Sequence, residues 1–235
     1  MLDLVGTTFA AALYTAIIGA LVGHAHADTA KKLGAVALAT LWLGMITAIA
    51  ALGLSAGAIG PLPAGLLPFI SFCALLFGAW LLVPEFRTAI LSVPLSILVG
   101  LNAGRIAGLF FVLLYMDGRL PAPFAPSAGY GDIAAGIVAV PLAAALALGW
   151  NLRARWVGLW NGLGALDLLV AVLLGALSAP GAPFRVFTEG PGTLAMTTLP
   201  WIFIPAMLVP LYLLIHLAIA VKLLKGASAS RLALA

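Results

Sequence analysis

The sequence predicts an all-α membrane protein in which one domain, residues 1–235, forms a transmembrane bundle of seven helices. The chain is 64% hydrophobic and only 8% charged, with a mean hydropathy of +1.22. An average soluble domain is about 25% charged. Apolar stretches of the roughly 20 residues that a helix needs to cross a bilayer recur along the chain. The expected spans are residues 6–26, 33–54, 66–83, 90–115, 132–150, 156–177 and 199–223.

The basic residues predict how these spans are oriented. Eight of the eleven Lys and Arg residues fall in alternate connections or in the C-terminal tail, and only Arg119 and Arg185 fall on the opposite side. Cytoplasmic loops collect Lys and Arg, so we expect an outer N-terminus and a cytoplasmic C-terminus in a multi-pass protein of the bacterial inner membrane. The eight residues are Lys31, Lys32, Arg87, Arg153, Arg155, Lys222, Lys225 and Arg231.

The first span ends at Ala25-His26-Ala27, which resembles a signal-peptide cleavage site. However, the segment before it carries Asp3 and no Lys or Arg, whereas Lys31 and Lys32 follow it. A secretory signal has the opposite polarity. We therefore expect the first helix to be retained.

Small residues predict close helix–helix contacts on the fourth and sixth spans, because lipid provides no hydrophobic drive for helices to associate. The residues concerned are Gly100, Gly104 and Gly108 on the fourth span, and Gly158, Gly162 and Ala165 on the sixth.

The outer connections and the last span are rich in Pro and Gly. The expected outer connections, 55–65, 116–131 and 178–198, are longer than the cytoplasmic ones. In the last span, Pro205 and Pro210 each remove a helical hydrogen bond and should bend its outer half.

Three charged residues, Arg105, Asp132 and Asp167, fall inside or at the edge of the spans, all in the expected outer half of the bundle. A charge at the centre of a membrane costs about 2.5–3.5 kcal/mol, so such residues usually face the bundle interior and find partners. We expect them to cluster, with Asn102 and Asn161 extending the cluster. The cluster could be a structural ion pair that fixes helix register, or a polar site that binds an anion or exchanges a proton.

Asp132 has two further interpretations. It follows Gly129-Tyr130-Gly131 and opens an apolar run, as a helix N-cap does. The same four residues match the GxGD signature of intramembrane aspartyl proteases, with Asp167 as the second carboxylate. In that family the other aspartate precedes GxGD, whereas Asp167 follows it, so the pattern argues against a protease.

The three histidines allow one alternative site. His24 and His26 close the first span, and His216 lies within the seventh. One of the first two could join His216 to ligate haem, or a transition metal together with a carboxylate such as Asp28. In the other interpretation, His24 and His26 lie at the membrane interface and His216 is hydrogen-bonded inside the bundle. No HxxxH or HExxH spacing supports a metal site.

Composition limits the remaining classes. No basic cluster exceeds two adjacent residues, so nucleic acid is not an expected partner, whereas basic loops suit the anionic lipids of a bilayer. The lone Cys73 excludes an internal disulfide and a cysteine metal cluster. The last span has no central lysine for a retinal Schiff base, since its lysine Lys222 lies at the cytoplasmic end.

Several segments together resemble uncharacterised bacterial polytopic membrane proteins, over roughly residues 95–220. The resemblance implies no activity. It implies that Arg105, Asp132, Asp167 and the outer Pro-rich connection form one unit. The segments are Arg105–Gly108, Gly118–Pro121, Phe124-Ala125, Ala128–Asp132, Trp160–Gly164 with Asp167, and Leu199–Pro205 through Pro210 to His216.

The function these features favour is that of a small-solute carrier or ligand-binding membrane protein, without a cofactor and not an enzyme. Arg105 would bind a small anionic solute and Asp167 would be the proton-linked carboxylate. One alternative is a haem- or metal-dependent redox protein or membrane enzyme built on His216. Another is an accessory subunit that packs, as a homo-oligomer or within a larger complex, through its small-residue surfaces.

Overall fold

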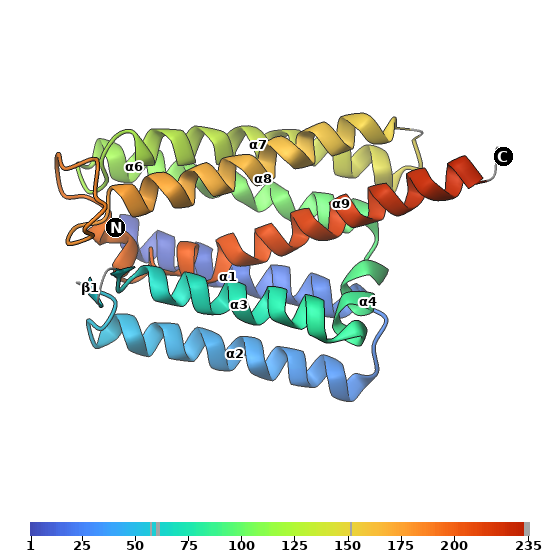
Figure 1. Cartoon of the computed structure of the whole chain (residues 1–235), viewed down its shortest axis with the longest axis horizontal. Coiled ribbons are helices and arrows are strands. Elements are labelled where there is room, and N and C mark those ends of the chain that lie inside the picture. The colour runs from blue at the N-terminus through green and yellow to red at the C-terminus, as the bar shows by residue number, and fades with distance from the viewer. Residues whose placement is uncertain (57, 60–61, 151, 233–235) are drawn as a thin grey trace.

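The computed structural model describes residues 1–56, 58–59, 62–150 and 152–232, with side chains to residue 226 apart from 58 and 59. Long helices run side by side along one axis, and the irregular segments gather mainly at the end that holds the N-terminus (Figure 1). The described strands are two residues each, β1 Ala58–Ile59 and β2 Leu62–Pro63, paired antiparallel. The all-α fold class is therefore confirmed.

The helices follow one another with short connections at the far end and longer ones at the N-terminal end. In chain order they are α1 Leu2–His24, α2 Thr29–Ala51, α3 Leu66–Leu82, α4 Pro84–Ser92, α5 Leu95–Leu101, the 3₁₀ segment η1 Asn102–Gly108, α6 Leu109–Met116, α7 Phe124–Ala147, α8 Ala154–Leu177, the 3₁₀ turn η2 Leu194–Thr197, the π-helical turn η3 Ile204–Leu208 and α9 Val209–Leu232.

Six described helices are long and apolar enough to cross a membrane, and there are up to seven if the bent pair of α3 and α4 counts as one span. That pair bends by 97°. The predicted span 90–115 begins too early, because α4 ends at Ser92 and the continuous apolar helix runs over Leu95–Met116. Pro94 disfavours helical backbone at Val93, which is extended, so the helix breaks there.

The expected span 132–150 and connection 116–131 are also wrong at their shared boundary, since α7 begins at Phe124. Asp132 therefore lies two turns inside α7, and its interpretation as an N-cap is wrong. Pro126 occupies the first turn of α7, where the missing N–H would have no helical partner in any case. A Pro- and Gly-rich stretch that reads as a loop is thus compatible with a helix start.

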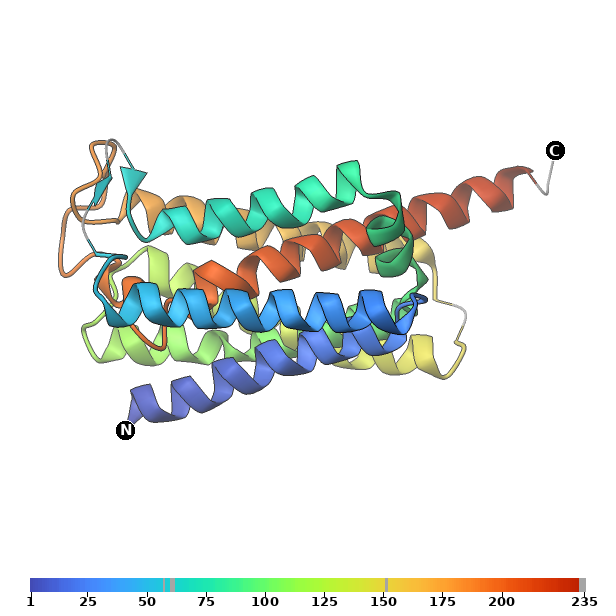
Figure 2. The same cartoon turned by 90° about the horizontal axis from the view of Figure 1, so that it is seen from below.

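The ends of the elements divide the basic residues as the sequence predicts. The start of α2, all of α4, the start of α8 and the last turns of α9 lie at the end of the bundle away from the N-terminus (Figures 1 and 2). These segments, together with Arg153 directly before α8, carry seven of the eight basic residues assigned to that end, and the eighth, Arg231, lies beyond the described side chains. The connections that carry Arg119 and Arg185 lie at the opposite end.

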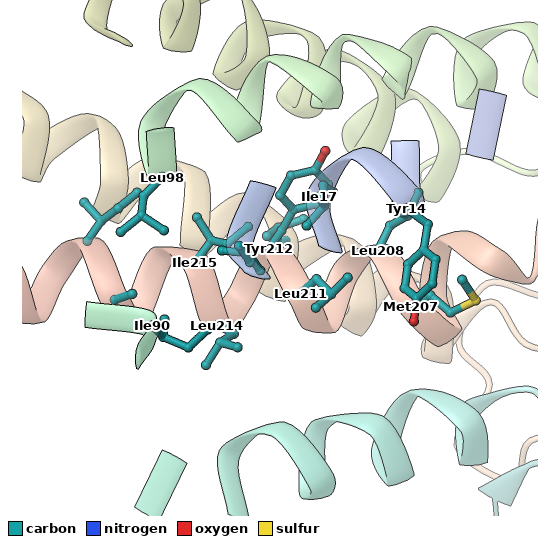
Figure 3. Packing of buried hydrophobic residues seen from close by; sticks show 14 of the residues in the cluster. Tyr14, Ile17, Ile90, Leu98, Met207, Leu208, Leu211, Tyr212, Leu214 and Ile215 are labelled. Carbon is teal, nitrogen blue, oxygen red and sulfur yellow. The ribbon is translucent and has the colours of Figure 1, made fainter. Parts of the chain in front are cut away.

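The central element is the last span, of which 67% is buried inside the protein, compared with 6% for α2. Its apolar side chains, among them Leu211 and Ile215, pack between α1, α4 and α5 (Figure 3). The Tyr14 hydroxyl of α1 donates to the Ala39 carbonyl oxygen of α2 at 2.9 Å. Because this part of the last span is enclosed, His216, which is 2% exposed, faces protein rather than lipid.

The predicted glycine seam on the fourth span is confirmed and the one on the sixth is not. A Cβ added at Gly108 would meet the Asp132 Cβ at 2.5 Å, and one at Gly104 would meet the Tyr212 hydroxyl at 2.6 Å. At Gly162, by contrast, an added Cβ would meet no atom of the described residues within 4 Å. The sixth span makes its close approach two residues later, at Gly164.

Candidate functional site

The 3₁₀ geometry of η1 places Arg105, the cation of the site, on the buried face of the segment. A 3₁₀ helix has about three residues per turn, so residues three apart lie above one another. Asn102, Arg105 and Gly108 are accordingly the buried residues of η1. Gly108 lets this face approach α7, and Gly136 of α7 packs against the η1 backbone in the same way, since an added Cβ would lie 2.7 Å from the Ile106 nitrogen. The close approach brings Arg105 within reach of two neighbouring helices.

Arg105 binds two carboxylates at once. Its Nε donates to Asp132 Oδ1 of α7 at 2.7 Å, and one terminal nitrogen donates to Asp167 Oδ2 of α8 at 2.6 Å. The Arg105 side chain is 1% exposed, whereas the side chains of Asp132 and Asp167 are 14% and 19% exposed. The expected cluster of one cation and two carboxylates is therefore present, with the guanidinium innermost.

The other terminal nitrogen of Arg105 joins the cluster to α8 and α9. It donates to the Gly164 carbonyl oxygen at 3.0 Å and lies 3.0 Å from His216 Nε2. A guanidinium has five N–H donors and no acceptor, so Nε2 of His216 must accept this bond. Four of the five donors of Arg105 are thus engaged.

His216 is fixed by a reciprocal pair of bonds with Asn161. His216 Nδ1 lies 2.8 Å from Asn161 Oδ1, and Asn161 Nδ2 donates to the His216 carbonyl oxygen at 3.1 Å. Because Nε2 accepts from Arg105, Nδ1 carries the proton and donates to Asn161, which assigns the neutral tautomer. The predicted hydrogen-bonded role of His216 inside the bundle is confirmed.

The charges of the cluster do not balance. One guanidinium faces two carboxylates, and the neighbouring imidazole is neutral, so the ionised cluster carries one excess negative charge. An excess charge in a poorly hydrated site is costly and favours a proton or a cation as its compensation. An anion placed beside Arg105 would instead add to the excess.

A cavity of about 30 Å³ adjoins the cluster, and Arg105, Asp132 and Tyr212 are among its lining residues. The Tyr212 hydroxyl is buried and has no hydrogen-bond partner within the described part of the chain. A buried hydroxyl without a partner costs about 1–3 kcal/mol. The cavity therefore offers a charged acceptor and an unsatisfied hydroxyl to a small polar group.

Asn102 and the remaining histidines lie apart from these contacts. Asn102 Nδ2 donates to the Leu98 carbonyl oxygen at 3.1 Å, one turn back in its own span, and none of its contacts joins it to Arg105. His24 Nδ1 lies 3.0 Å from the carbonyl oxygen of Ala20, and His26 is exposed.

The residues named for the alternative metal site make other contacts. Asp28 caps α2, where its Oδ1 accepts from the Lys31 backbone N–H at 2.8 Å. No group of three or more His, Cys, Asp or Glu residues suited to a metal ion occurs among the described residues. Both ring nitrogens of His216 are held in hydrogen bonds, so ligation by His216 would require those bonds to break.

His216 was considered only apart from this cluster, and two further residues of the site, Gly164 and Tyr212, were not predicted at all. Both carry a signal in their spacing. Tyr212 precedes His216 by four residues and so shares its helix face, and Gly164 lies midway between Asn161 and Asp167 at intervals of three. A search for small or polar residues at these intervals from the predicted site would have found both.

A protein-family match covers the region of the chain that contains the site. Residues 61–224 match the family described as Domain of unknown function (DUF8737). The chain belongs to this family. The matched region contains Arg105, Asp132, Asp167 and His216, and begins after α1 and α2. No curated protein and no solved structure matches the chain. The resemblance to an uncharacterised family without known activity is thereby confirmed, and the chain is a membrane-type helical protein of unidentified activity.

Proposed function

We propose that this protein is a small-solute carrier or ligand-binding protein of the bacterial inner membrane whose central site exchanges a proton. The observation that supports the proposal is the sharing of one buried guanidinium by Asp132 and Asp167 from two different helices. Charged residues at membrane depth are costly, and they typically mark solute or proton pathways. The ligand would enter the cavity between Arg105 and Tyr212.

The contacts favour the proton-linked part of this function over the binding of an anion by Arg105. Four donors of Arg105 already serve protein acceptors, and the ionised cluster has an excess negative charge. A proton on one carboxyl neutralises that excess without breaking the remaining ion pair. In this scheme Arg105 holds the two carboxylates in place, and either carboxylate takes up or releases the proton.

The proposal includes an orientation and a span count. The end of the bundle that carries most of the basic residues would face the cytoplasm, with α1 beginning outside and the bent pair of α3 and α4 counted as the third of seven spans. The cavity would then lie in the outer half of the bundle.

An infrared pH titration of the protein in lipid discs tests the proton exchange. As the pH falls, protonation of the cluster should give a carboxyl stretching band while the exposed carboxylates are still ionised, and this band should be absent from Asp132→Asn and from Asp167→Asn. Asp28→Asn is the matched control, because Asp28 lies in the connection between α1 and α2, where it caps α2 and pairs with Lys31. A titration that neither Asp132→Asn nor Asp167→Asn alters would refute the proposal.

A further inference from the structure

A second, larger cavity adjoins the polar one. It has a volume of about 100 Å³, is partly open, and lies at the N-terminal end of the bundle between α3, α8, η3 and the segment that follows α8. Its walls are apolar, and they include Phe69, Phe124, Val172, Ala176 and Met196. An enclosed apolar cavity of about 150 Å³ binds benzene, so a partly open apolar cavity of about 100 Å³ suits a small apolar group.

The two cavities share part of their walls. Phe111, Ile204 and Val209 line both, so the apolar cavity lies directly against the polar one. Ile204 opens the π-helical turn η3, whose wider winding is typical of functional positions in helices. An apolar space thus leads towards a space that contains Asp132 and the Tyr212 hydroxyl.

We infer that the ligand of this site is a small molecule with a compact apolar part and one hydrogen-bond-donating end, either an ammonium or a hydroxyl group. The inference rests on the proposed function and names its substrate class. The apolar part would occupy the larger cavity, and the donating end would bind Asp132 and the Tyr212 hydroxyl. A ligand with a carboxylate end would face the excess negative charge and bind more weakly.

The order of the two cavities argues against a membrane lipid as the ligand. The apolar cavity lies nearer the end of the bundle and the polar one lies deeper, as Asp132 is two turns inside α7. A lipid in the outer leaflet has the reverse order, with its polar group near the surface and its chains at depth. A compact molecule that enters with its polar end first matches the arrangement.

Benzylamine, benzyl alcohol and benzoate test this inference, because they share one ring and differ in the polar end. Binding to the protein in lipid discs would be measured by ligand-observed magnetic resonance, with thermal shift as a second readout. Benzylamine and benzyl alcohol should each bind at least about tenfold more tightly than benzoate, and the comparison of the two distinguishes an ammonium from a hydroxyl ligand. Equal binding of all three, or tighter binding of benzoate, would overturn the inference.

A pair of substitutions on α8 locates the binding. Ala176→Phe fills the apolar cavity and should weaken the binding of benzylamine at least about tenfold. Leu173→Phe adds a ring on the same helix at a residue that is 57% exposed, and should leave binding unchanged. If both variants bind benzylamine as the unmodified protein does, the ligand lies elsewhere and the inference fails.

The failure of this inference and the failure of the proposed function are distinguishable. Asp132→Asn should remove the preference for benzylamine over benzoate, whereas the infrared titration reports proton exchange without any added ligand. Proton exchange with no selective binding contradicts only the ligand class. Selective binding without proton exchange contradicts only the proton-linked part of the function.

Discussion

Removing the Arg105 guanidinium should destabilise the protein by leaving two carboxylates uncompensated. Arg105→Gln keeps a polar side chain of moderate length but loses the charge and the bonds to Asp132, Asp167, Gly164 and His216. Two of these bonds join opposite charges, and a hydrogen bond to a charged group contributes about 1.5–3 kcal/mol. The sum of about 3–6 kcal/mol agrees with the roughly 3–5 kcal/mol lost when one partner of a buried pair is removed.

A double-mutant cycle separates the ion pair from general damage to the fold. If the loss comes from uncompensated carboxylates, Arg105→Gln combined with Asp167→Asn should be less harmful than the two single losses added together. We expect a coupling of about 1–3 kcal/mol, measured as the free energy of unfolding by steric trapping in lipid discs. The same cycle with Asp132→Asn should give a coupling of similar size.

The pair between Arg119 and Asp3 provides the matched control, because its atoms are 2.8 Å apart, close to the 2.6 Å between Arg105 and Asp167, but its side chains are 31% and 54% exposed. Its coupling should stay below about 1 kcal/mol. If the Arg105 and Asp167 changes add within about 0.5 kcal/mol, the two groups are not energetically coupled and the reasoning is refuted.

Three further predictions concern the packing around the site and the helix ends. Gly164→Ala should destabilise the protein, because the added Cβ would lie 2.8 Å from an imidazole carbon of His216. In Gly162→Ala the added Cβ meets no described atom within 4 Å, so this change should be neutral or raise stability by about 0.5–1 kcal/mol. Equal effects of the two changes on the free energy of unfolding would contradict this prediction. Trp42→Phe removes the donor to the Ala206 carbonyl oxygen of η3, 3.1 Å away, and should cost about 1–3 kcal/mol, which an unchanged free energy of unfolding would disprove. The backbone N–H of Lys31 donates to the Asp28 carboxylate and holds the pKa of that carboxyl below its usual 3.8. The Asp28 cap therefore stabilises α2 fully above pH 3.8, and this stabilisation is lost as the pH falls through the lowered pKa. Amide exchange at the start of α2 should show this acid dependence, and it should vanish in Asp28→Asn.

The cluster was predictable because the cost of burying charge leaves few alternatives. Arg105, Asp132 and Asp167 lie in different spans, and a charge in an apolar span must face the interior and find a partner. Only the approximate depth and the charge of each residue were needed to place them together. Asn161 was named for its polarity and reaches the cluster through His216.

The details of the site depended on helix geometry that an ideal α-helical reading does not contain. The glycines of the fourth span were read at intervals of four, whereas η1 buries Asn102, Arg105 and Gly108 at intervals of three. Asp132 was placed at a helix start because it follows Gly129-Tyr130-Gly131 and opens an apolar run, although α7 begins at Phe124 and accommodates Pro126 in its first turn. Asn102 was expected in the cluster and instead bonds within its own span.

Two irregular helical segments meet at the polar cavity, since both η1 and η3 contribute to its lining. Such windings have poorer hydrogen-bond geometry than an α-helix, and they persist where neighbouring groups compensate for it. In α9, Pro210 cannot donate to the Ala206 carbonyl oxygen one turn back, and the Trp42 indole of α2 donates to that oxygen instead. Leu13 of α1 closes the cavity beside Gly104. The family match begins after α1 and α2, yet α1 lines the polar cavity through Leu13 and α2 binds η3 through Trp42. The ligand-binding unit that we propose therefore includes these two helices as well as the matched region.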